Sequence, residues 1–263
     1  VLRLIRKWLN AGIVEDGNWS DEGRGTPQGA SLSPLLANVY LHYVFDLWAK
    51  AWRDRHANGD MIIVRFADDV VVGFQHEGDA RRFQDDLRQR LAKFGLELAQ
   101  DKTRLIEFGR FAADNRRRRG LGRTETFTFP GFVHLCALTR NGKFLLRRHT
   151  IAQRMRAKLR EVKLALKRRM HLPIPVQGAW LASVVRGYFA YYAVPTNSHA
   201  MRRFRLEVVK LWYRALRRRS QRTRLNWQRM WPIADDWLPR ASDQHPWPNV
   251  RFDGRTQGRS PVR

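Results

Sequence analysis

Cysteine is almost absent from this chain. Cys136 is the single cysteine among 263 residues, which excludes an internal disulfide and a zinc site built from four cysteines. So few thiols are typical of proteins kept in a reducing compartment. The sequence therefore predicts a cytoplasmic protein.

Long hydrophobic runs are also missing. Charged residues interrupt every apolar stretch, so no segment is long enough to span a bilayer and none has the form of a signal peptide. Hydrophobic residues still make up 43% of the chain, enough for the core of one large domain or two small ones. The opening "VLRLIRKWLN" lacks Met and has the pattern of a helix interior, so we expect a fragment of a longer protein.

Acidic residues are scarce. Twenty-four Asp and Glu face 50 Lys and Arg, which gives a net charge of +26. Such an excess indicates a polyanionic partner, with nucleic acid ahead of a membrane surface. Residues 1–146 hold 23 basic and 18 acidic residues, whereas 147–263 hold 27 and 6. We therefore expect the second half to bind the partner.

The first half alternates between helix and strand patterns. Ser33 and Pro34 are typical of a helix start, and apolar residues then recur at helical spacing. This stripe consists of Leu36, Tyr40, Tyr43, Leu47 and Trp48. The remaining expectations are a helix over 79–95, strands around 61–66, 70–74, 96–99, 126–135 and 143–146, a turn at Asn141-Gly142, and a loop at Arg116–Arg119.

The second half is patterned as helices. Apolar residues at helical spacing predict helices over 151–170, 176–193 and 199–219, followed by a poorly packed tail. The predicted fold is α+β, an antiparallel sheet with packed helices followed by an all-α region. The predicted domains are 1–146, 147–238 and a basic tail, 239–263.

The segment "IIVRFADDVVVGF", residues 62–74, places two adjacent carboxylates between two apolar strands. At a hairpin turn, Asp68 and Asp69 can both reach the sheet surface. Paired carboxylates repel each other unless a cation compensates, and Mg²⁺ prefers oxygen ligands completed by substrate phosphates. With the basic charge, this favours metal-assisted nucleotidyl transfer. An ordinary solvated turn, in which Asp is common, is the alternative.

Four motifs, in order and spacing, resemble the palm of reverse transcriptases. They are "GTPQGASLSPLLANVYL" (25–41), "VRFADDVVVGF" (64–74), "FGLELAQDKTRLIEFG" (94–109) and "FPGFVH" (129–134). The segments "WLASVVRGYFAYYAVPTN" (180–197) and "FRLEVVKLWYRALRRRSQ" (204–221), with the tail "HPWPNVRFDGRTQGRSPVR", resemble the thumb and maturase region of group II intron-encoded proteins. The resemblance covers nearly the whole chain and implies a right-hand polymerase palm followed by a helical thumb.

The resemblance assigns roles to particular residues. Asp68 and Asp69 correspond to the metal-binding pair of a two-Mg²⁺ site, and Lys102 would lie near the triphosphate and assist departure of pyrophosphate. Nucleotide and template contacts would come from Thr26, Pro27, Gln28, Gly29 and Phe66. The primer grip would be Phe129, Gly131 and Phe132. RNA would be bound by Arg154, Arg156, Lys158, Lys163, Lys167, Arg168, Arg217, Arg218 and Arg219.

The chain departs from the family pattern in three places. Phe66 replaces the usual Tyr before Ala-Asp-Asp, and Pro130 replaces the usual Leu of Phe-Leu-Gly-Phe. The third carboxylate of the polymerase site belongs to a strand that, in the family, precedes Val1. We therefore expect an incomplete two-metal site and little or no DNA synthesis by this polypeptide alone.

The resemblance implies the partners and the function. The partners would be group II intron RNA, an RNA template, a DNA primer and deoxynucleoside triphosphates, with no membrane, in a bacterial cytoplasm or on its nucleoid. The predicted function is RNA-directed DNA polymerisation with a maturase role in splicing. One alternative is an RNA-binding maturase module without polymerisation, and another is a basic DNA-binding protein. Trp212 and Tyr213, set among arginines, are candidates for stacking on bases.

Overall fold

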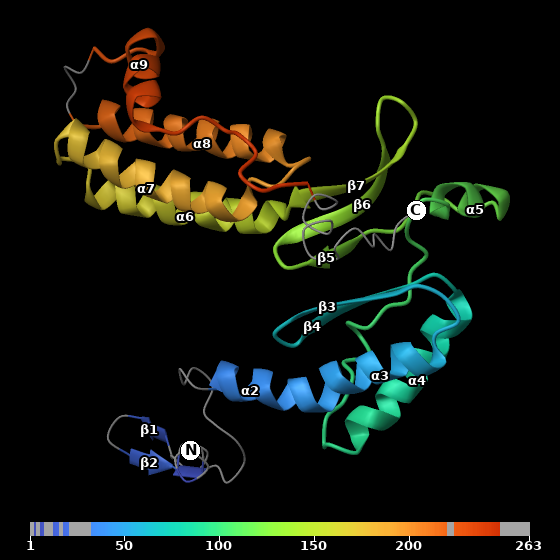
Figure 1. Ribbon diagram of the computed structural model, residues 1–263. Helices are drawn as coiled ribbons and strands as arrows, with labels where there is room; N and C mark the ends of the chain where they lie inside the picture. The colour runs from blue at the N-terminus through green and yellow to red at the C-terminus, as the bar shows by residue number, and fades with distance from the viewer. Residues whose placement is uncertain are drawn as a thin grey trace. The chain divides into compact units, whose positions relative to one another are not determined.

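The computed structural model of the chain describes residues 3, 6–7, 13–15, 18–20, 33–219 and 224–247. It divides into two compact units, Val1–Leu105 and Ile106–Arg263, whose elements are labelled in Figure 1. The described residues form helices and small antiparallel sheets, so the expected α+β class is confirmed at that level. The domain division at residue 146 stays a prediction.

The first unit consists of two hairpins and a set of helices. Strands β1 and β2 pair antiparallel, and so do β3 and β4. Helices α2, η1 and α3 follow one another without a break, and η1 is a π-helical turn. The bounds are β1 Ile13–Glu15, β2 Asn18–Ser20, α2 Ser33–Leu41, η1 His42–Asp46, α3 Leu47–His56, β3 Met61–Phe66, β4 Asp69–Phe74 and α4 Glu77–Ala92.

The core of the first unit lies between these helices and one face of the β3–β4 hairpin. Its buried residues are Val44, Phe45, Ala49, Trp52, Met61, Phe83, Leu87 and Leu91. The apolar stripe expected on the first helix is therefore wrong for three of its five residues, since Tyr40, Tyr43 and Leu47 are exposed, while Trp48 packs against the core. The buried residues Val44, Phe45, Ala49 and Trp52 recur at helical spacing on another side of the segment, and the sequence offered two apolar faces of which the prediction chose the wrong one.

Two further local predictions are wrong. Residues 96–99 form no strand, since Leu96 and Leu98 pack against the core without a partner strand. The run Arg116–Arg119 is not a loop, because α5, Ala112–Arg118, includes most of it. Ion pairs of Arg116 with Glu125 and of Arg119 with Glu107 offset the repulsion between neighbouring arginines there.

A three-stranded sheet follows α5 in the second unit. Strands β5 Phe127–Phe129, β6 Phe132–Leu138 and β7 Phe144–Thr150 pair antiparallel in that order. Residues Asn141 and Gly142 turn the chain between β6 and β7 as expected, with Gly142 at φ 73°. Strand β7 ends beside the start of β6, where the Ile151 backbone N–H donates to the Gly131 carbonyl. Helix α6 begins at the next residue, Ala152.

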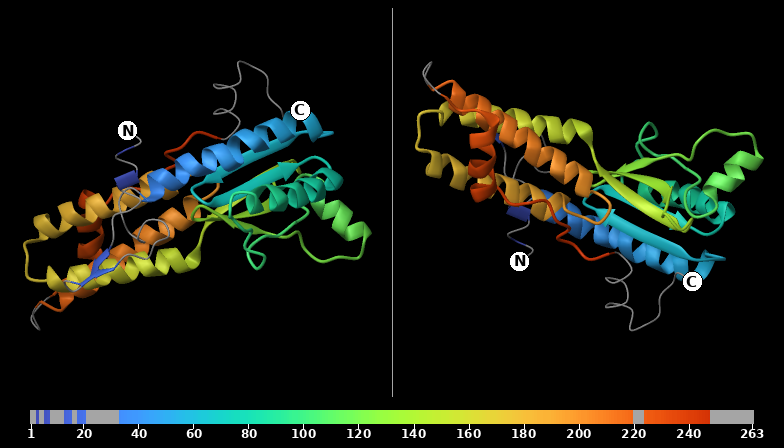
Figure 2. Two further views of the ribbon diagram at one scale, coloured as in Figure 1. Left: turned by 90° about the horizontal axis from the view of Figure 1, so that it is seen from below. Right: turned by 90° about the horizontal axis from the view of Figure 1, so that it is seen from above.

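Three long helices and a short fourth one form the rest of the second unit. The bounds are α6 Ala152–Arg168, α7 Ile174–Tyr192, α8 Ser198–Arg217 and α9 Trp227–Trp237. Helices α6, α7 and α8 run side by side, and α9 is set across them (Figures 1 and 2). The first three agree with the predicted helices to within a few residues, whereas α9 was not predicted.

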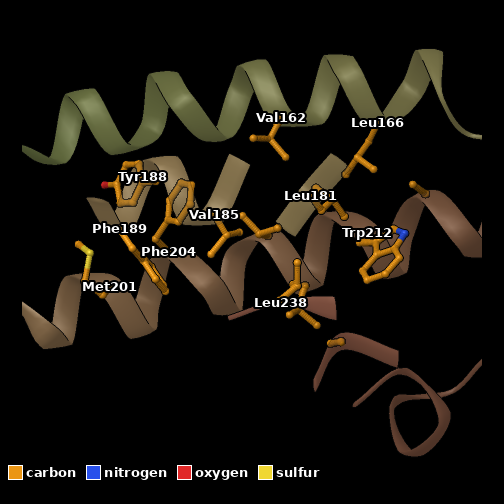
Figure 3. Close-up of a cluster of buried hydrophobic side chains, with 14 of the residues drawn as sticks. Val162, Leu166, Leu181, Val185, Tyr188, Phe189, Met201, Phe204, Trp212 and Leu238 are labelled. Carbon is orange, nitrogen blue, oxygen red and sulfur yellow. The ribbon is translucent and has the colours of Figure 1, made fainter. Parts of the chain in front are cut away.

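The apolar faces of these four helices share one core. Figure 3 shows Val162 and Leu166 of α6 above Leu181, Val185 and Phe189 of α7. Helix α8 contributes Phe204 and Trp212, both fully buried. Burying each such side chain contributes about 1.5–3 kcal/mol relative to exposure, so this core is the main source of stability for the unit.

Buried polar groups fasten the helices to one another and to the sheet. Gln177 of α7 accepts a hydrogen bond from the Trp212 indole at 2.8 Å and donates to the Arg169 carbonyl at the end of α6. Asn197 accepts from the Thr150 backbone N–H at 3.1 Å and donates to its hydroxyl at 2.8 Å. These bonds satisfy groups that would otherwise be costly to bury.

The net positive charge lies entirely in the second unit. Residues 1–105 contain 15 Lys and Arg and 15 Asp and Glu, whereas residues 106–263 contain 35 and 9. Within the described ranges, no helix has the length and apolar character needed to cross a membrane. The positive charge is therefore a property of the unit that contains the helical bundle.

Candidate active site

The two candidate metal ligands lie at a tight hairpin turn. Phe66 pairs with Asp69, so Ala67 and Asp68 are the two turn residues between β3 and β4. Ala67 has φ 53°, a left-handed conformation that two-residue hairpins require at this position. It costs a non-glycine residue about 1–2 kcal/mol, and such strain gathers at functional sites. We call Phe66–Asp69 the aspartate turn.

Both carboxylates of the aspartate turn are accessible. Side chains alternate along a strand, so Asp69 shares the outward face of the hairpin with Val64 and Phe66, which are 46% and 58% exposed. Asp68 and Asp69 are exposed as well. Among the described residues neither forms an ion pair, and both can therefore accept a cation.

Arg65 holds the aspartate turn to the helices beneath it. Its guanidinium donates to both carboxylate oxygens of Asp46, each at 2.7 Å. It also donates to the Asn38 side chain at 2.8 Å and to the Ala67 carbonyl at 2.9 Å. One side chain thus ties α2 and η1 to the strained residue beside Asp68. Sequence reasoning overlooked Arg65, although a charged residue on the inward face of an apolar strand was a signal.

The Arg65 contacts also account for Asp46. The hydrogen bonds from Arg65 lower the pKa of the Asp46 carboxyl, against the opposing effect of burial. Both of its oxygens are taken up by Arg65, so Asp46 stabilises the turn and is not placed to serve as a further metal ligand.

The remaining nucleotide-site candidates are placed only in part. Lys102 is exposed in a turn, where its backbone N–H donates to the Ala99 carbonyl at 3.1 Å. Phe66 lies at the end of β3, beside the carboxylates. Thr26, Pro27, Gln28 and Gly29 lie outside the described residues, so their proposed contacts with template and nucleotide remain predictions.

The three primer-grip candidates come together in the second unit. Phe129 pairs with Phe132 across a turn made of Pro130 and Gly131, and Gly131 has φ 84°. Phe132 is buried and stacks on Tyr191 of α7 with ring centroids 6.0 Å apart. Tyr191, which sequence reasoning did not single out, donates its hydroxyl to the Pro130 carbonyl at 3.0 Å.

A β-carbon would not fit well at Gly131. It would lie 3.1 Å from the Tyr191 ring and 3.5 Å from a terminal nitrogen of Arg154. The turn, Tyr191 and the first predicted RNA-binding arginine therefore form one compact group.

The predicted RNA-binding cations mostly point to solvent. On α6, Arg154, Arg156, Lys163, Lys167 and Arg168 are exposed, opposite the buried face of Met155, Val162 and Leu166. Lys158 is half-buried and pairs with Glu161 at 2.8 Å. Helix α6 thus presents a basic face to solvent.

The cations at the end of α8 differ in exposure. Arg217 and Arg218 are exposed, whereas Arg219 is half-buried and donates to the Met170 and Leu172 carbonyls in the loop after α6. Their role in RNA binding stays a prediction, and Arg219 also has this structural role.

One of the two base-stacking candidates is wrong. Trp212 is fully buried and its indole N–H donates to Gln177, so no base can reach it. Tyr213 is half-buried and stacks on Trp227 of α9. The arginine-rich sequence around position 212 did not distinguish the inward from the outward face of α8.

The aspartate turn suits a hard divalent cation in part. It offers two adjacent, exposed carboxylates, the ligand type that Mg²⁺ takes together with substrate phosphates. Over the described ranges, no three His, Cys, Asp or Glu side chains gather in a way that could hold a metal ion.

Comparison with known proteins gives one matching family and two similar proteins. The family described as reverse transcriptase (RNA-dependent DNA polymerase) matches residues 2–134. A 40-residue segment is 55% identical to the group II intron-encoded protein LtrA of Lactococcus lactis subsp. cremoris, covering 15% of this chain and 7% of LtrA. A 41-residue segment is 51% identical to an uncharacterized 91 kDa protein in a cob intron of Schizosaccharomyces pombe, covering 16% and 5%. The matches thus span a small part of these relatives.

Proposed function

We propose a function from one premise: this chain belongs to the reverse transcriptase family of RNA-dependent DNA polymerases. It serves a group II intron, and its aspartate turn is the metal-binding part of the polymerase site. The observation that carries the proposal is the geometry of the turn. Asp68 and Asp69 are exposed at the end of the outward sheet face, and Arg65 fixes the strained residue beside them. An ordinary solvated turn would not need such a clamp.

The reaction is nucleotidyl transfer. The 3′-hydroxyl of the primer attacks the α-phosphorus of a deoxynucleoside triphosphate, loses its proton, and pyrophosphate leaves. Bound Mg²⁺ would neutralise charge on the attacking and leaving oxygens. Asp68 would be the ligand shared with the nucleotide phosphates and Asp69 the second ligand.

Two more side chains of the first unit have proposed roles. Phe66, 58% exposed beside the carboxylates, would pack against the primer terminus or template. The Lys102 ammonium would neutralise the leaving pyrophosphate or give it a proton. Thr26–Gly29 would contact the template base and the incoming nucleotide.

We propose a maturase role for the second unit, in which its basic helices form a thumb that binds intron RNA. Support comes from the exposed cations of α6 and from the concentration of the whole net charge in residues 106–263. Contacts of this kind are made to the phosphate backbone and position the RNA. Phe129, Gly131 and Phe132 would hold the primer strand.

An RNA-binding module without polymerisation is the second candidate. The neutral balance of residues 1–105 favours it, because little charge there attracts a template–primer duplex. The expectation that this polypeptide alone makes little DNA is compatible with both functions and stays a prediction. The two candidates differ in whether the aspartate turn binds a metal ion with nucleotide.

Metal binding at the aspartate turn is testable without catalysis. Mn²⁺, added with a deoxynucleoside triphosphate and a primer–template duplex, should broaden the amide NMR signals of residues 67–70. Asp68→Asn should abolish this broadening, whereas Asp85→Asn, at an exposed carboxylate on α4, should not. Broadening that persists in Asp68→Asn would remove this residue from the site. Any Mg²⁺-dependent primer extension by the chain should likewise be lost in Asp68→Asn.

A further inference from the structure

Helices α8 and α9 expose a group of stacked aromatic rings. Tyr213 of α8 stacks on Trp227 of α9 with ring centroids 4.1 Å apart and planes inclined by 23°. Trp231, one turn further along α9, lies 6.0 Å from Trp227. Trp227 and Trp231 are each 39% exposed. We call Tyr213, Trp227 and Trp231 the aromatic patch.

Tyr213 packs against the helical core, whereas Trp227 and Trp231 are not among the residues that pack against it. Helix α9 buries Met230 and Ala234 completely, while Trp227 and Trp231 flank these residues and keep much of their indole surface in water. Exposing large aromatic rings side by side is unfavourable unless another molecule covers them. The patch is therefore a candidate contact surface.

Positive charge surrounds the aromatic patch. Residues 208–237 contain eight Lys and Arg against two Asp, Asp235 and Asp236, and Asp235 pairs with Arg205 at 2.6 Å. Arg217 places its guanidinium 5.7 Å from the centre of the Tyr213 ring. The exposed cations of this segment, none of which pairs with an acidic side chain within the described ranges, are Arg214, Arg217, Arg218, Arg224 and Arg229.

Flat rings beside unpaired arginines fit an unpaired nucleotide. Its base has a π-face that stacks on an indole, and its phosphate is attracted by the guanidinium groups. An apolar protein surface would complement the rings but not the cations, and a continuous duplex would offer phosphates but no accessible base face. Charge complementarity therefore selects single-stranded nucleic acid.

We propose that Trp227 and Trp231 form a stacking site for unpaired RNA bases, supported by Tyr213 and by the surrounding arginines. This rests on the proposed RNA-binding function and adds what kind of RNA element this end of the bundle takes. Intron RNA with bases exposed in loops or bulges would contact α9 through those bases, while its helical parts contact cations through phosphates.

The test compares two ligands of equal charge. Fluorescence anisotropy would give the affinity of the whole chain for a 12-nucleotide oligoadenylate and for an abasic ribose-phosphate oligomer of the same length. The wild-type chain should prefer the base-bearing oligomer by about 5-fold or more, as expected for loss of stacking on one or two rings. The abasic oligomer measures the phosphate contribution alone.

Three variants separate stacking from packing. Trp227→Leu/Trp231→Leu keeps apolar volume but removes the π-faces, and should lose the preference while binding the abasic oligomer unchanged. Trp227→Phe/Trp231→Phe should keep most of the preference. Trp247→Ala, at an indole 47% exposed outside the patch, is the matched control and should behave as wild type.

The outcomes distinguish the two proposals. A preference that survives in the Leu variant, or that is absent from the wild type although RNA is bound, would overturn the stacking site alone. A wild-type chain that binds neither oligomer nor intron RNA would overturn the RNA-binding function itself. The circular dichroism and melting temperature of the Leu variant should match those of the wild type. A loss of preference for the base-bearing oligomer then cannot be attributed to unfolding.

Discussion

At the scale of single residues, Gly178 shows how tightly the second unit is packed. A β-carbon at this position on α7 would lie 2.4–2.9 Å from three carbons of the Trp237 indole. These carbons are near the ring's attachment point, so the ring cannot move aside cheaply. Helix α9 therefore depends on the absence of a side chain at Gly178.

Gly178→Ala should accordingly destabilise the second unit by about 1–3 kcal/mol, the usual cost of overpacking a core. Gly187→Ala is the matched control on the same helix, where a β-carbon would meet no atom within 4 Å, and it should raise stability by up to about 1 kcal/mol because alanine favours helix. Urea unfolding followed by circular dichroism measures both. Equal effects of the two substitutions would contradict the packing described here.

The candidate site could be predicted from sequence where the signal was local. The adjacent carboxylates between two apolar strands indicated a hairpin turn, and the structure places them there. Arg65 was not predicted, because its partners Asp46 and Asn38 lie 19 and 27 residues away. Trp212 was wrongly predicted to stack on bases. Its burial results from packing against α7, and the neighbouring arginines in the sequence do not indicate that packing.

At the scale of secondary-structure elements, the strongly amphipathic helices were predictable and the irregular ones were not. Helices α6 and α8 carry their apolar residues on one stripe, and that pattern survives in the fold. The π-helical turn η1 has no sequence signature, and the helical segment around it has two apolar faces, which made its buried face hard to choose. Helix α9 was not predicted, and it contains Pro232, a residue that removes an internal hydrogen bond; its buried residues Met230 and Ala234 hold it in place.

Strands β6 and β7 contain two histidines that link stability to pH. His134 stacks on Phe127 with ring centroids 4.7 Å apart, and burial, together with nearby Arg148, lowers its pKa. Burial and Arg147 likewise lower the pKa of His149. Both residues therefore favour the neutral form in the folded protein, while the unfolded chain takes up protons near pH 6.5.

The free energy of unfolding of the second unit should therefore fall with acid. The contribution of His134 is fully present above its unfolded pKa and is lost as the pH falls through its lower folded pKa. His134→Phe should make the pH dependence between about pH 7 and 5 shallower, and His171→Phe, an exposed histidine of the same unit, should not. Thermal unfolding across this pH range measures the difference. An unchanged dependence in His134→Phe would show that other groups are responsible.

At the scale of the whole molecule, the two units differ in net charge and in the candidate sites that they present. The first unit has no net charge and presents the aspartate turn, whereas the second has the full +26 and presents basic helices. A polymerase site needs local carboxylates to hold metal ions, while RNA binding needs cations spread over a surface.

We expect the basic helices to bind intron RNA independently of the aspartate turn, and the salt-dependent affinity for a structured group II intron RNA measures this most directly. Three variants would be compared with wild type. Arg156→Glu/Lys163→Glu/Lys167→Glu reverses an exposed row on α6, and Arg55→Glu/Arg81→Glu/Arg88→Glu makes the same change of charge on the first unit. The third variant is Asp68→Asn.

The affinity of the wild-type chain should fall steeply with salt, because each neutralised phosphate adds about −0.7 to −0.9 to the slope of log K against log salt concentration. The α6 variant should bind more weakly with a flatter slope, while Asp68→Asn should bind like wild type and the first-unit variant should keep most of the affinity. A flat wild-type slope, or equal losses in the two charge-reversed variants, would contradict the assignment of RNA binding to the basic helices.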